Sequence, residues 1–283
     1  MKLPAFDYAA PATVAEAVRL LGSRPGAKAL AGGQSLIPTL AFRLAAPPLL
    51  VDLRKINELR HIAFDANAVR LGARVRWRDI EDDGQLGAAH PLLVAAVGHV
   101  AHYQIRNRGT IGGSLAHADP AAELPGIAVT CDATIAITAR KGERTIAAAD
   151  FFTGALSTVL ADDELITELR LPAWPRARRW AFEEFARRRG DFALAGVALF
   201  YDLDAQGYVR NAHIGVIGAC HRPHRVPQAE AALNGRRCDA ATIGTAAKAL
   251  QTALEPPSDL HASAAYRRAL AGTLLERALA ATL

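Results

Sequence analysis

The chain has 283 residues, of which 51% are hydrophobic and 22% are charged. This is enough to bury a sizeable core in one to three domains, and it excludes wholesale disorder. The longest uncharged stretch, residues 84–105, contains Pro91 and three histidines, so its dense apolar part is too short for a membrane span. The first residues show no apolar segment typical of a secretory signal.

Three cysteines stand far apart, at positions 131, 220 and 238, and no CxxC pair or Cys/His cluster is present. These cysteines do not match a zinc ribbon or an iron–sulfur cluster held by four cysteines. A disulfide framework is not expected either, and a reducing cytoplasm fits best. The formal charge of +5 comes from scattered arginines, with one cluster at residues 176–189.

The N-terminal part predicts two helices and two short strands. Thr13 and Glu16 form a capping-box pattern for a helix over 14–21, which Gly22 ends. Residues 28–31 and 49–53 are apolar runs typical of buried strands. Between them, apolar residues resume at Leu36, which predicts a helix start with Pro38 in its first turn.

The middle of the chain predicts a mixture of short strands and helices. A turn at 65–67 separates strands at 62–64 and 69–71, a short charged helix begins at Asp79, and a buried helix covers 91–100. Residues 134–138 and 165–171 alternate between apolar and polar residues, as strands do. The segment from Pro172 to Pro175 then breaks the pattern, which predicts a domain boundary.

After this break the chain changes character. Two β-rich runs, 196–203 and 208–218, flank a hairpin signal at residues 204–207. Three helices are predicted at 228–233, 240–254 and 263–279. In the last of them Tyr266, Leu270 and Leu274 are spaced four apart, which predicts a stripe facing the core.

Two Gly-Gly pairs, at 32–33 and 112–113, are each followed by a serine, Ser35 or Ser114. Glycines let successive backbone N–H groups point into one space, and such a nest binds anions. Two such turns brought together would hold a pyrophosphate. Neither pair matches the Rossmann or P-loop motif, and ordinary tight turns remain the alternative for each pair alone.

Longer strings around these pairs resemble the two flavin-binding motifs of one family. The first string is Ala31-Gly-Gly-Gln-Ser-Leu-Ile-Pro38, and the second is Thr110-Ile-Gly-Gly-Ser-Leu-Ala-His-Ala-Asp-Pro-Ala-Ala-Glu-Leu-Pro125. A third, Phe182-Glu-Glu-Phe-Ala-Arg-Arg-Arg-Gly-Asp-Phe-Ala193, resembles the segment that opens the family's C-terminal domain. In order and over its whole length, the chain resembles the FAD-binding medium subunit of molybdenum hydroxylases, the carbon monoxide dehydrogenase and xanthine dehydrogenase family.

The resemblance implies an α+β fold with an FAD-binding domain of the PCMH (vanillyl-alcohol-oxidase) type. This domain would have two subdomains, residues 1–58 and 59–174, with FAD between them. Residues 175–283 would form a C-terminal domain with a small antiparallel sheet and helices. The predicted break at residues 172–175 falls where that domain is expected to begin.

The resemblance also places residues around the cofactor. Backbone amides of the first motif would wrap the pyrophosphate, and Ser35 would add a hydroxyl. The residues of this motif are Leu30, Ala31, Gly32, Gly33, Gln34, Ser35, Leu36 and Ile37. Three residues of the second motif would form another phosphate-side turn: Thr110, Gly113 and Ser114. The rest of FAD would meet His117 at the flavin's polar chain, Glu123 near its ribityl end, Val100 and Ala101 from a helix end, and Leu165 and Ile166 near the isoalloxazine ring.

This chain departs from the xanthine-dehydrogenase-type pattern at three places. Those proteins usually have Asn where this chain has Ser114, Asp where it has Glu123, and a lysine at the equivalent of Glu183. The departures leave the electron acceptor open, NAD in particular.

By resemblance, the chain is an oxidoreductase subunit that transfers electrons through FAD. Partner subunits would carry the other cofactors, a small subunit the [2Fe-2S] clusters and a large subunit the molybdenum cofactor. A dimer of such heterotrimers is expected, with no nucleic-acid partner and no membrane span. The hydroxylated substrate stays open among carbon monoxide, a purine, an N-heteroaromatic compound and an aromatic acyl-CoA, since its pocket would lie on another chain.

Two alternatives remain. A stand-alone flavin oxidase or dehydrogenase would need its own acid–base residues, and the short C-terminal domain is poor in candidates. A basic nucleic-acid-binding module would use a cluster such as Arg187 to Arg189, but Glu183, Glu184 and Asp191 beside it favour a mixed-charge surface or a subunit interface.

Overall fold

The computed structural model describes residues 2–283, and residues 2–59 fold around a small parallel sheet. The sheet has the order β1 (Asp7–Ala9), β3 (Leu49–Asp52) and β2 (Lys28–Leu30). Helix α1 (Val14–Leu21) begins where the Thr13 hydroxyl accepts a hydrogen bond from the Glu16 N–H, and it buries Ala17, Val18 and Leu21 against the sheet. Helix α2 (Leu36–Ala41) follows β2, and two 3₁₀ turns, η1 (Leu53–Lys55) and η2 (Asn57–Leu59), lead out of this unit.

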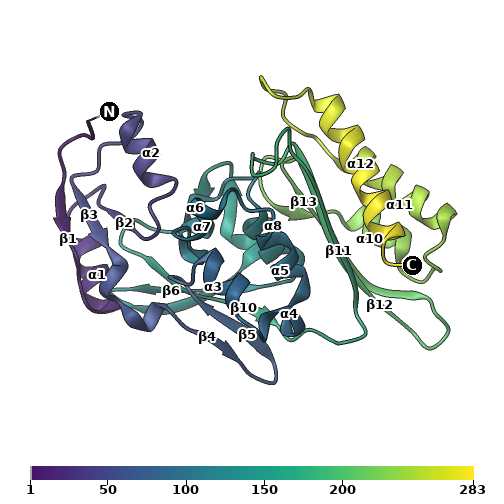
Figure 1. Cartoon of the computed structure of the whole chain (residues 1–283), viewed down its shortest axis with the longest axis horizontal. Helices are drawn as coiled ribbons and strands as arrows, with labels where there is room; N and C mark the ends of the chain where they lie inside the picture. The colour runs from purple at the N-terminus through teal and green to yellow at the C-terminus, as the bar shows by residue number, and fades with distance from the viewer. Residues whose placement is uncertain (1) are drawn as a thin grey trace.

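The next unit is a five-stranded antiparallel sheet with helices packed on it. Its order is β4 (Ile62–Phe64), β5 (Ala68–Gly72), β10 (Leu165–Pro172), β6 (Thr134–Ala139) and β7 (Gly142–Ala147). The helices are α3 (Trp77–Asp82), α4 (Leu86–Ala89), α5 (Pro91–Val97), α6 (Tyr103–Arg106), α7 (Ile111–His117), α8 (Glu123–Thr130) and α9 (Ala148–Phe151). A short hairpin of β8 (Phe152–Gly154) and β9 (Ser157–Thr158) follows α9. Helices α5, α7 and α8 lie between this sheet and the C-terminal part of the chain (Figure 1).

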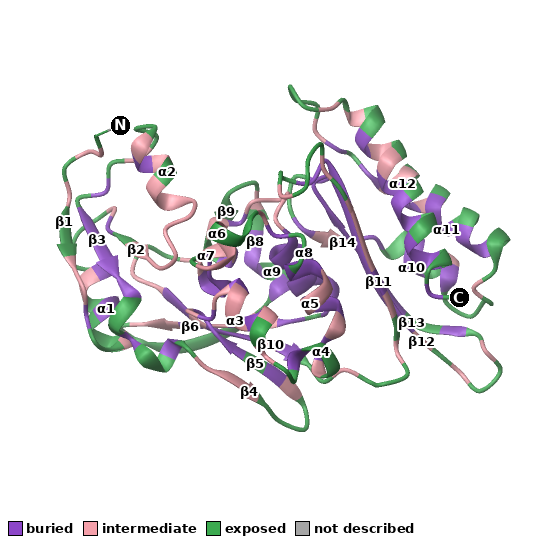
Figure 2. Cartoon of the chain, in the orientation of Figure 1, coloured by how far each residue is buried: buried purple, intermediate pink, exposed green. Residues whose placement is uncertain are grey.

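The C-terminal part is an antiparallel sheet covered by three helices. The order is β11 (Arg179–Phe185), β12 (Ala195–Leu203), β13 (Val209–Ile217) and β14 (His224–Arg225). Helices α10 (Pro227–Leu233), α11 (Ala240–Ala253) and α12 (Ala264–Ala280) pack on one face. The other face packs on the middle unit, so β12 and β13 are buried along nearly their whole length (Figure 2).

Strand alternation explains how one sheet serves two cores. In β11, Ala181 packs with the C-terminal helices, whereas Trp180 and Phe182 pack against the core of the middle unit. On β12, Leu199 packs with the C-terminal helices and its neighbour Phe200 packs in the core of the middle unit. Successive side chains of a strand point to opposite faces. The middle and C-terminal units are therefore joined by continuous apolar packing.

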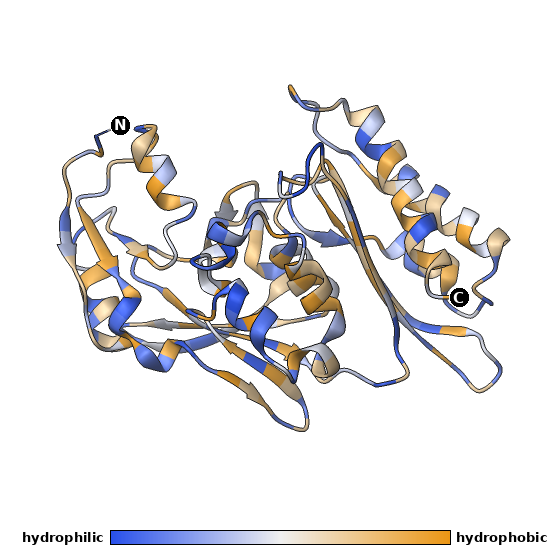
Figure 3. Ribbon diagram, viewed as in Figure 1, coloured by the Kyte–Doolittle hydropathy of each residue, from blue (hydrophilic) through white to orange (hydrophobic). Residues whose placement is uncertain are grey.

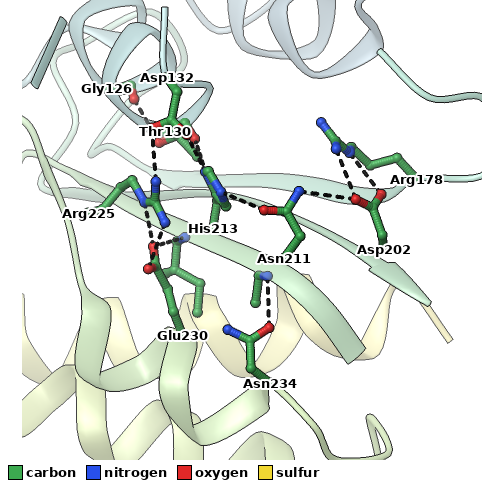
Figure 4. A network of polar contacts seen from close by, with 12 residues as sticks. Gly126, Thr130, Asp132, Arg178, Asp202, Asn211, His213, Arg225, Glu230 and Asn234 are labelled. Carbon is green, nitrogen blue, oxygen red and sulfur yellow. Dashed lines mark hydrogen bonds and ion pairs between the residues drawn. The ribbon is translucent and has the colours of Figure 1, made fainter. Parts of the chain in front are cut away.

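A polar network also joins these two units (Figure 4). Arg225 of β14 donates to the Asp132 carboxylate (2.9 Å) of the loop after α8 and pairs in a fork with Glu230 of α10. His213 of β13 places its Nδ1 at 2.8 Å from the Thr130 carbonyl, and its Nε2 lies at 3.1 Å from the Asn211 side chain. These contacts tie the end of α8 to the C-terminal sheet.

Most predicted elements are present. Residues 179–185, for which no element was predicted, form a strand of the C-terminal sheet. Two predictions are corrected. The second Gly-Gly pair does not form a turn, because both glycines belong to α7. Tyr266 does not face the core but is 48% exposed, and the buried stripe of α12 begins at Arg267, whose guanidinium donates to the carbonyls of Leu194 and Gly218. Among residues 2–283 no helix is both long and apolar enough to cross a bilayer.

Candidate functional site

The first glycine segment forms a cradle of free backbone donors between β2 and α2. Gly33 has a φ of +73°, a conformation that L side chains rarely adopt, and it turns the chain sharply. The N–H groups of Gly32, Gly33, Gln34 and Ser35 donate to no acceptor within residues 2–283. The Ser35 hydroxyl does not cap α2. Four consecutive free donors and a hydroxyl fit a phosphate group bound mainly by backbone.

The second glycine segment offers fewer free donors than the sequence predicts. Thr110 caps α7 by accepting from the Gly113 N–H (3.2 Å), and the Ser114 N–H donates to the Thr110 carbonyl. The Gly112 N–H donates to the Ala73 carbonyl at 2.8 Å. The Gly112 amide therefore ties α7 to the residue after β5, and the other two close the first turn of α7. This segment is left with mainly the hydroxyls of Thr110 and Ser114 for a ligand.

The two segments meet because Gly32 has no side chain. A Cβ at Gly32 would lie 2.2 Å from the Arg108 carbonyl oxygen and 2.9 Å from the Cα of Gly109. Ala31 packs in the same apolar cluster as Leu165 of β10, so the start of that strand also lies at this junction. The structure therefore brings Leu30 to Ile37, Thr110 and Leu165 together at the boundary between the first two units.

Two more predicted residues, Val100 and Ala101, lie at the boundary with the C-terminal sheet. Ala101 has a φ of +41°, and its carbonyl and that of Val100 accept from Arg106. A Cβ at Gly190 would lie 2.9 Å from the Ala101 carbonyl oxygen, so the loop after β11 packs on this bend. His117 is the last residue of α7. Ile166 follows Leu165 on β10 and is 3% exposed in the middle core.

Glu123 belongs to a buried pair of carboxyl groups. It begins α8, is 9% exposed, and no other residue donates to its carboxylate within residues 2–283. Burial, with a smaller contribution from the charge of Asp119, raises the pKa of Glu123 to about 7. Glu184 of β11 lies nearby: burial first, and then the Glu123 charge, raise its pKa to about 8. The Glu184 Oε2 is buried without a hydrogen-bond partner.

Sequence reasoning missed two features of this site. The sequence analysis treated Glu184 only as part of a mixed-charge surface. Once residues 179–185 are known to form a strand, the alternation of side chains places Glu184 on the face of β11 that packs on the middle unit. Four arginines that line a cavity at the junction of the glycine segments are scattered in sequence, and they are Arg60, Arg74, Arg76 and Arg108. No local pattern connects them.

Two features of the sequence, possible metal ligands and the arginine cluster, can be placed in the structure. Residues 2–283 contain no group of three or more His, Cys, Asp or Glu side chains placed to hold a metal ion. Arg187 donates to the His261 carbonyl rather than lining a groove. The free amides between β2 and α2, by contrast, fit the phosphates of FAD, and buried carboxyls at the other end fit a polar chain bearing hydroxyls.

Comparisons with known proteins identify the family. Residues 4–174 match the family model described as the FAD binding domain in molybdopterin dehydrogenase, and residues 180–282 match the CO dehydrogenase flavoprotein C-terminal domain. The nicotine 6-hydroxylase medium subunit of Paenarthrobacter nicotinovorans is 40% identical over 99% of this chain and 98% of its own length. The carbon monoxide dehydrogenase medium chain of Hydrogenophaga pseudoflava is 36% identical over 98% and 96%.

Solved structures agree. A carbon monoxide dehydrogenase of H. pseudoflava that lacks the Mo-pyranopterin moiety superposes with a TM-score of 0.96 at 38% identity, covering 100% of this chain and 98% of the other. Quinoline 2-oxidoreductase from Pseudomonas putida 86 gives 0.95 at 39%, with the same coverage. The predicted α+β fold and FAD as cofactor are thereby confirmed. The chain belongs to the family of FAD-binding medium subunits of molybdenum hydroxylases of the carbon monoxide dehydrogenase type, which are oxidoreductase subunits.

Proposed function

We propose that this chain transfers electrons through FAD within a multi-subunit molybdenum hydroxylase, taking them from [2Fe-2S] clusters on a partner subunit and passing them to an external acceptor. Bound FAD supplies the redox chemistry, because it takes up and releases electrons one or two at a time. The observation that carries the proposal is the cradle of four unpartnered N–H groups from Gly32 to Ser35 in a chain of this family.

The chain's own residues would bind and orient the cofactor. The first glycine segment would hold the pyrophosphate, with hydroxyls from Ser35, Thr110 and Ser114. Glu123, at the start of α8, would accept from the ribityl hydroxyls. The remaining predicted residues would line the cofactor, namely Val100, Ala101, His117, Leu165 and Ile166. The bend at Ala101 and the loop around Gly190 would exclude water from the flavin end.

We infer that the partners are a small iron–sulfur subunit and a large subunit with the molybdenum cofactor, assembled as a dimer of heterotrimers. The free cysteines support a reducing compartment, and we propose the cytoplasm. The family relatives include a nicotine 6-hydroxylase and carbon monoxide dehydrogenases, so the substrate of this complex is left open.

The test is an absorption spectrum of the chain purified with its native complex, before and after acid denaturation. We expect about one FAD released per chain, with iron–sulfur absorbance from co-purifying partners. The Gly33→Val variant should lose most of its FAD, because Gly33 has a φ of +73° and its Cβ would lie 3.1 Å from Ile37 Cγ1. Gly84→Val, where the added Cβ meets nothing within 4 Å, is the control.

Two outcomes would contradict the proposal. A colourless complex whose chain also refuses added FAD would return the glycine segments to ordinary structural roles. Bleaching of the flavin by an organic substrate in the isolated chain would favour a stand-alone flavin oxidase or dehydrogenase instead.

A further inference from the structure

A cavity lined by arginines opens where the first glycine segment meets the loop before α7. Its volume is about 190 Å³, and its lining comes from four separate parts of the chain: Ala31, Gly32, Arg60, Arg74, Arg76, Asn107, Arg108 and Thr110. The Arg76 guanidinium donates to the Asn107 carbonyl (3.3 Å), which fixes the loop before α7 against the start of α3. Helix α3, which begins directly after Arg76, shows as a hydrophilic element at the centre of the molecule (Figure 3).

Positive charge in this cavity exceeds what the neighbouring carboxylates neutralise. Asp79 is the carboxylate that these arginines contact, and it accepts from Arg76 (2.7 Å) and from Arg60 (3.0 Å). These contacts hold the pKa of Asp79 far below its usual range, although burial opposes the shift. Four guanidinium groups therefore line the cavity, but only two of them, those of Arg60 and Arg76, pair with a carboxylate, and it is the same one.

The other two arginines have no carboxylate partner within residues 2–283. Arg74 donates to the Ile56 carbonyl (2.9 Å), and its pKa is lowered by burial and then by the positive charge of Arg60. Arg108 is exposed, and its guanidinium makes no hydrogen bond or ion pair with any of residues 2–283. Because like charges held together in a partly buried space repel one another, an anion entering the cavity relieves that repulsion.

A neighbouring hollow carries less unpaired charge than this cavity. It measures about 320 Å³ and shares Ala31 and Arg108 with the first cavity, but its other charged residues are Asp52 and Arg54. These two are paired, with the Arg54 Nε 2.7 Å from the Asp52 carboxylate. The preference for an anion therefore belongs to the first cavity.

We propose that the arginine-lined cavity binds a phosphate-type oxyanion, held by Arg108 and Arg74 with help from Arg60, Arg76 and the Thr110 hydroxyl. A guanidinium presents its N–H donors in a planar fork that matches two oxygens of a phosphate. The oxyanion has two sources of the same chemistry, the diphosphate of FAD or a free phosphate ion. For the first source the inference rests on the proposed function, since Gly32 and Thr110 also lie in the predicted FAD site.

The test compares ligand binding to the full-length chain, freed of flavin, by calorimetry. The ligands are FAD, ADP, inorganic pyrophosphate and riboflavin, which has no phosphate. The variant is Arg108→Gln, because this side chain has no partner in the fold and its loss removes a donor without breaking a structural contact. Arg277→Gln, an exposed arginine of α12 with no side-chain partner, is the matched control.

We expect Arg108→Gln to weaken pyrophosphate binding about tenfold or more, as the loss of a charge-assisted hydrogen bond does, while Arg277→Gln binds like the wild type. If FAD and ADP weaken in parallel and riboflavin does not, the oxyanion is the dinucleotide's diphosphate. If FAD binding is unchanged and pyrophosphate binds beside it, the source is a free ion.

Equal pyrophosphate binding by the wild type, Arg108→Gln and Arg277→Gln would overturn the inference. So would a wild type that binds no pyrophosphate, if Arg108→Gln also leaves the FAD affinity unchanged. A chain that binds pyrophosphate through Arg108 but never binds FAD would count against the proposed function alone. The two failures are therefore distinguishable.

Discussion

At the scale of single residues, the most unusual groups are two neighbouring carboxyls, Glu123 and Glu184, whose pKa values are both raised. Glu184 pairs with Gly196 on β12, and its Oε2 is buried without a hydrogen-bond partner in residues 2–283. Two carboxylates in such surroundings do not both ionise near neutral pH without cost. The pair therefore links folding stability to pH.

The direction of this linkage follows from the pKa values. Burial raises the pKa of Glu123 to about 7 and that of Glu184 to about 8, from ordinary values near 4.5. The folded chain then binds more protons than the unfolded chain between about pH 4.5 and pH 8. The stability from this pair is fully present below pH 4.5, is lost as the pH rises through 7 and 8, and changes little above that.

Glu184→Gln, which stays neutral at every pH, is therefore expected to lose less stability than the wild type between pH 5 and pH 8.5. Urea unfolding at the two pH values measures the difference. Glu276→Gln, at an exposed position of α12, is the control and should follow the wild type. A Glu184→Gln profile parallel to that of the wild type would show that the pair does not titrate as described.

At the scale of elements, helix α8 is held by close contacts with strand β13. All eight of its residues are buried, and it rests where β13 carries Gly215. A Cβ at Gly215 would lie 1.8 Å from the Thr130 hydroxyl oxygen, which donates to the Gly126 carbonyl at 2.7 Å. The glycine is thus required by the approach of the helix and not by its own backbone angles.

Gly215→Ala is expected to destabilise the fold by about 1–3 kcal/mol, as overpacking of a buried contact does. Gly244→Ala in α11 is the matched control, because nothing lies within 4 Å of its added Cβ and alanine favours a helix by about 1 kcal/mol. Urea unfolding measures the change in the free energy of unfolding, which should fall in Gly215→Ala and rise in Gly244→Ala. A Gly215→Ala chain as stable as the wild type would mean that α8 can shift away from β13 at no cost.

Elements were predictable where the signal is local. The Thr13 cap fixes the start of α1, and alternation predicts β10 to within one residue. The signal fails at α8, whose side chains are buried on all sides so that no apolar face repeats, and at β11, where arginines at the strand ends hide its alternation. In the candidate site the glycine motifs are visible in the sequence, whereas the proximity of Glu123 and Glu184 depends on how distant segments pack.

At the scale of the whole molecule, the candidate site crosses both boundaries between units, so its geometry depends on how they are joined. The polar network of Figure 4 lies on the second boundary. Glu230, 6% exposed, accepts from Arg225 and from the Ile214 N–H, while Arg225 also reaches Asp132 of the middle unit. Removing the arginine would leave a buried carboxylate without its counter-charge and would break a contact between the units.

Arg225→Met is therefore expected to cost about 3 kcal/mol and to loosen the C-terminal unit from the middle unit. Arg210→Met is the control, because Arg210 is exposed and its partner Asp204 lies in the same hairpin, so its loss should cost less than about 1 kcal/mol. Urea unfolding gives the cost, and limited proteolysis at residues 173–178 reports the loosening. If the units act as one body, cleavage rises and FAD affinity falls together in Arg225→Met. Unchanged FAD affinity beside faster cleavage would instead mean that the cofactor is held by the first two units alone, with the C-terminal sheet needed only for partners.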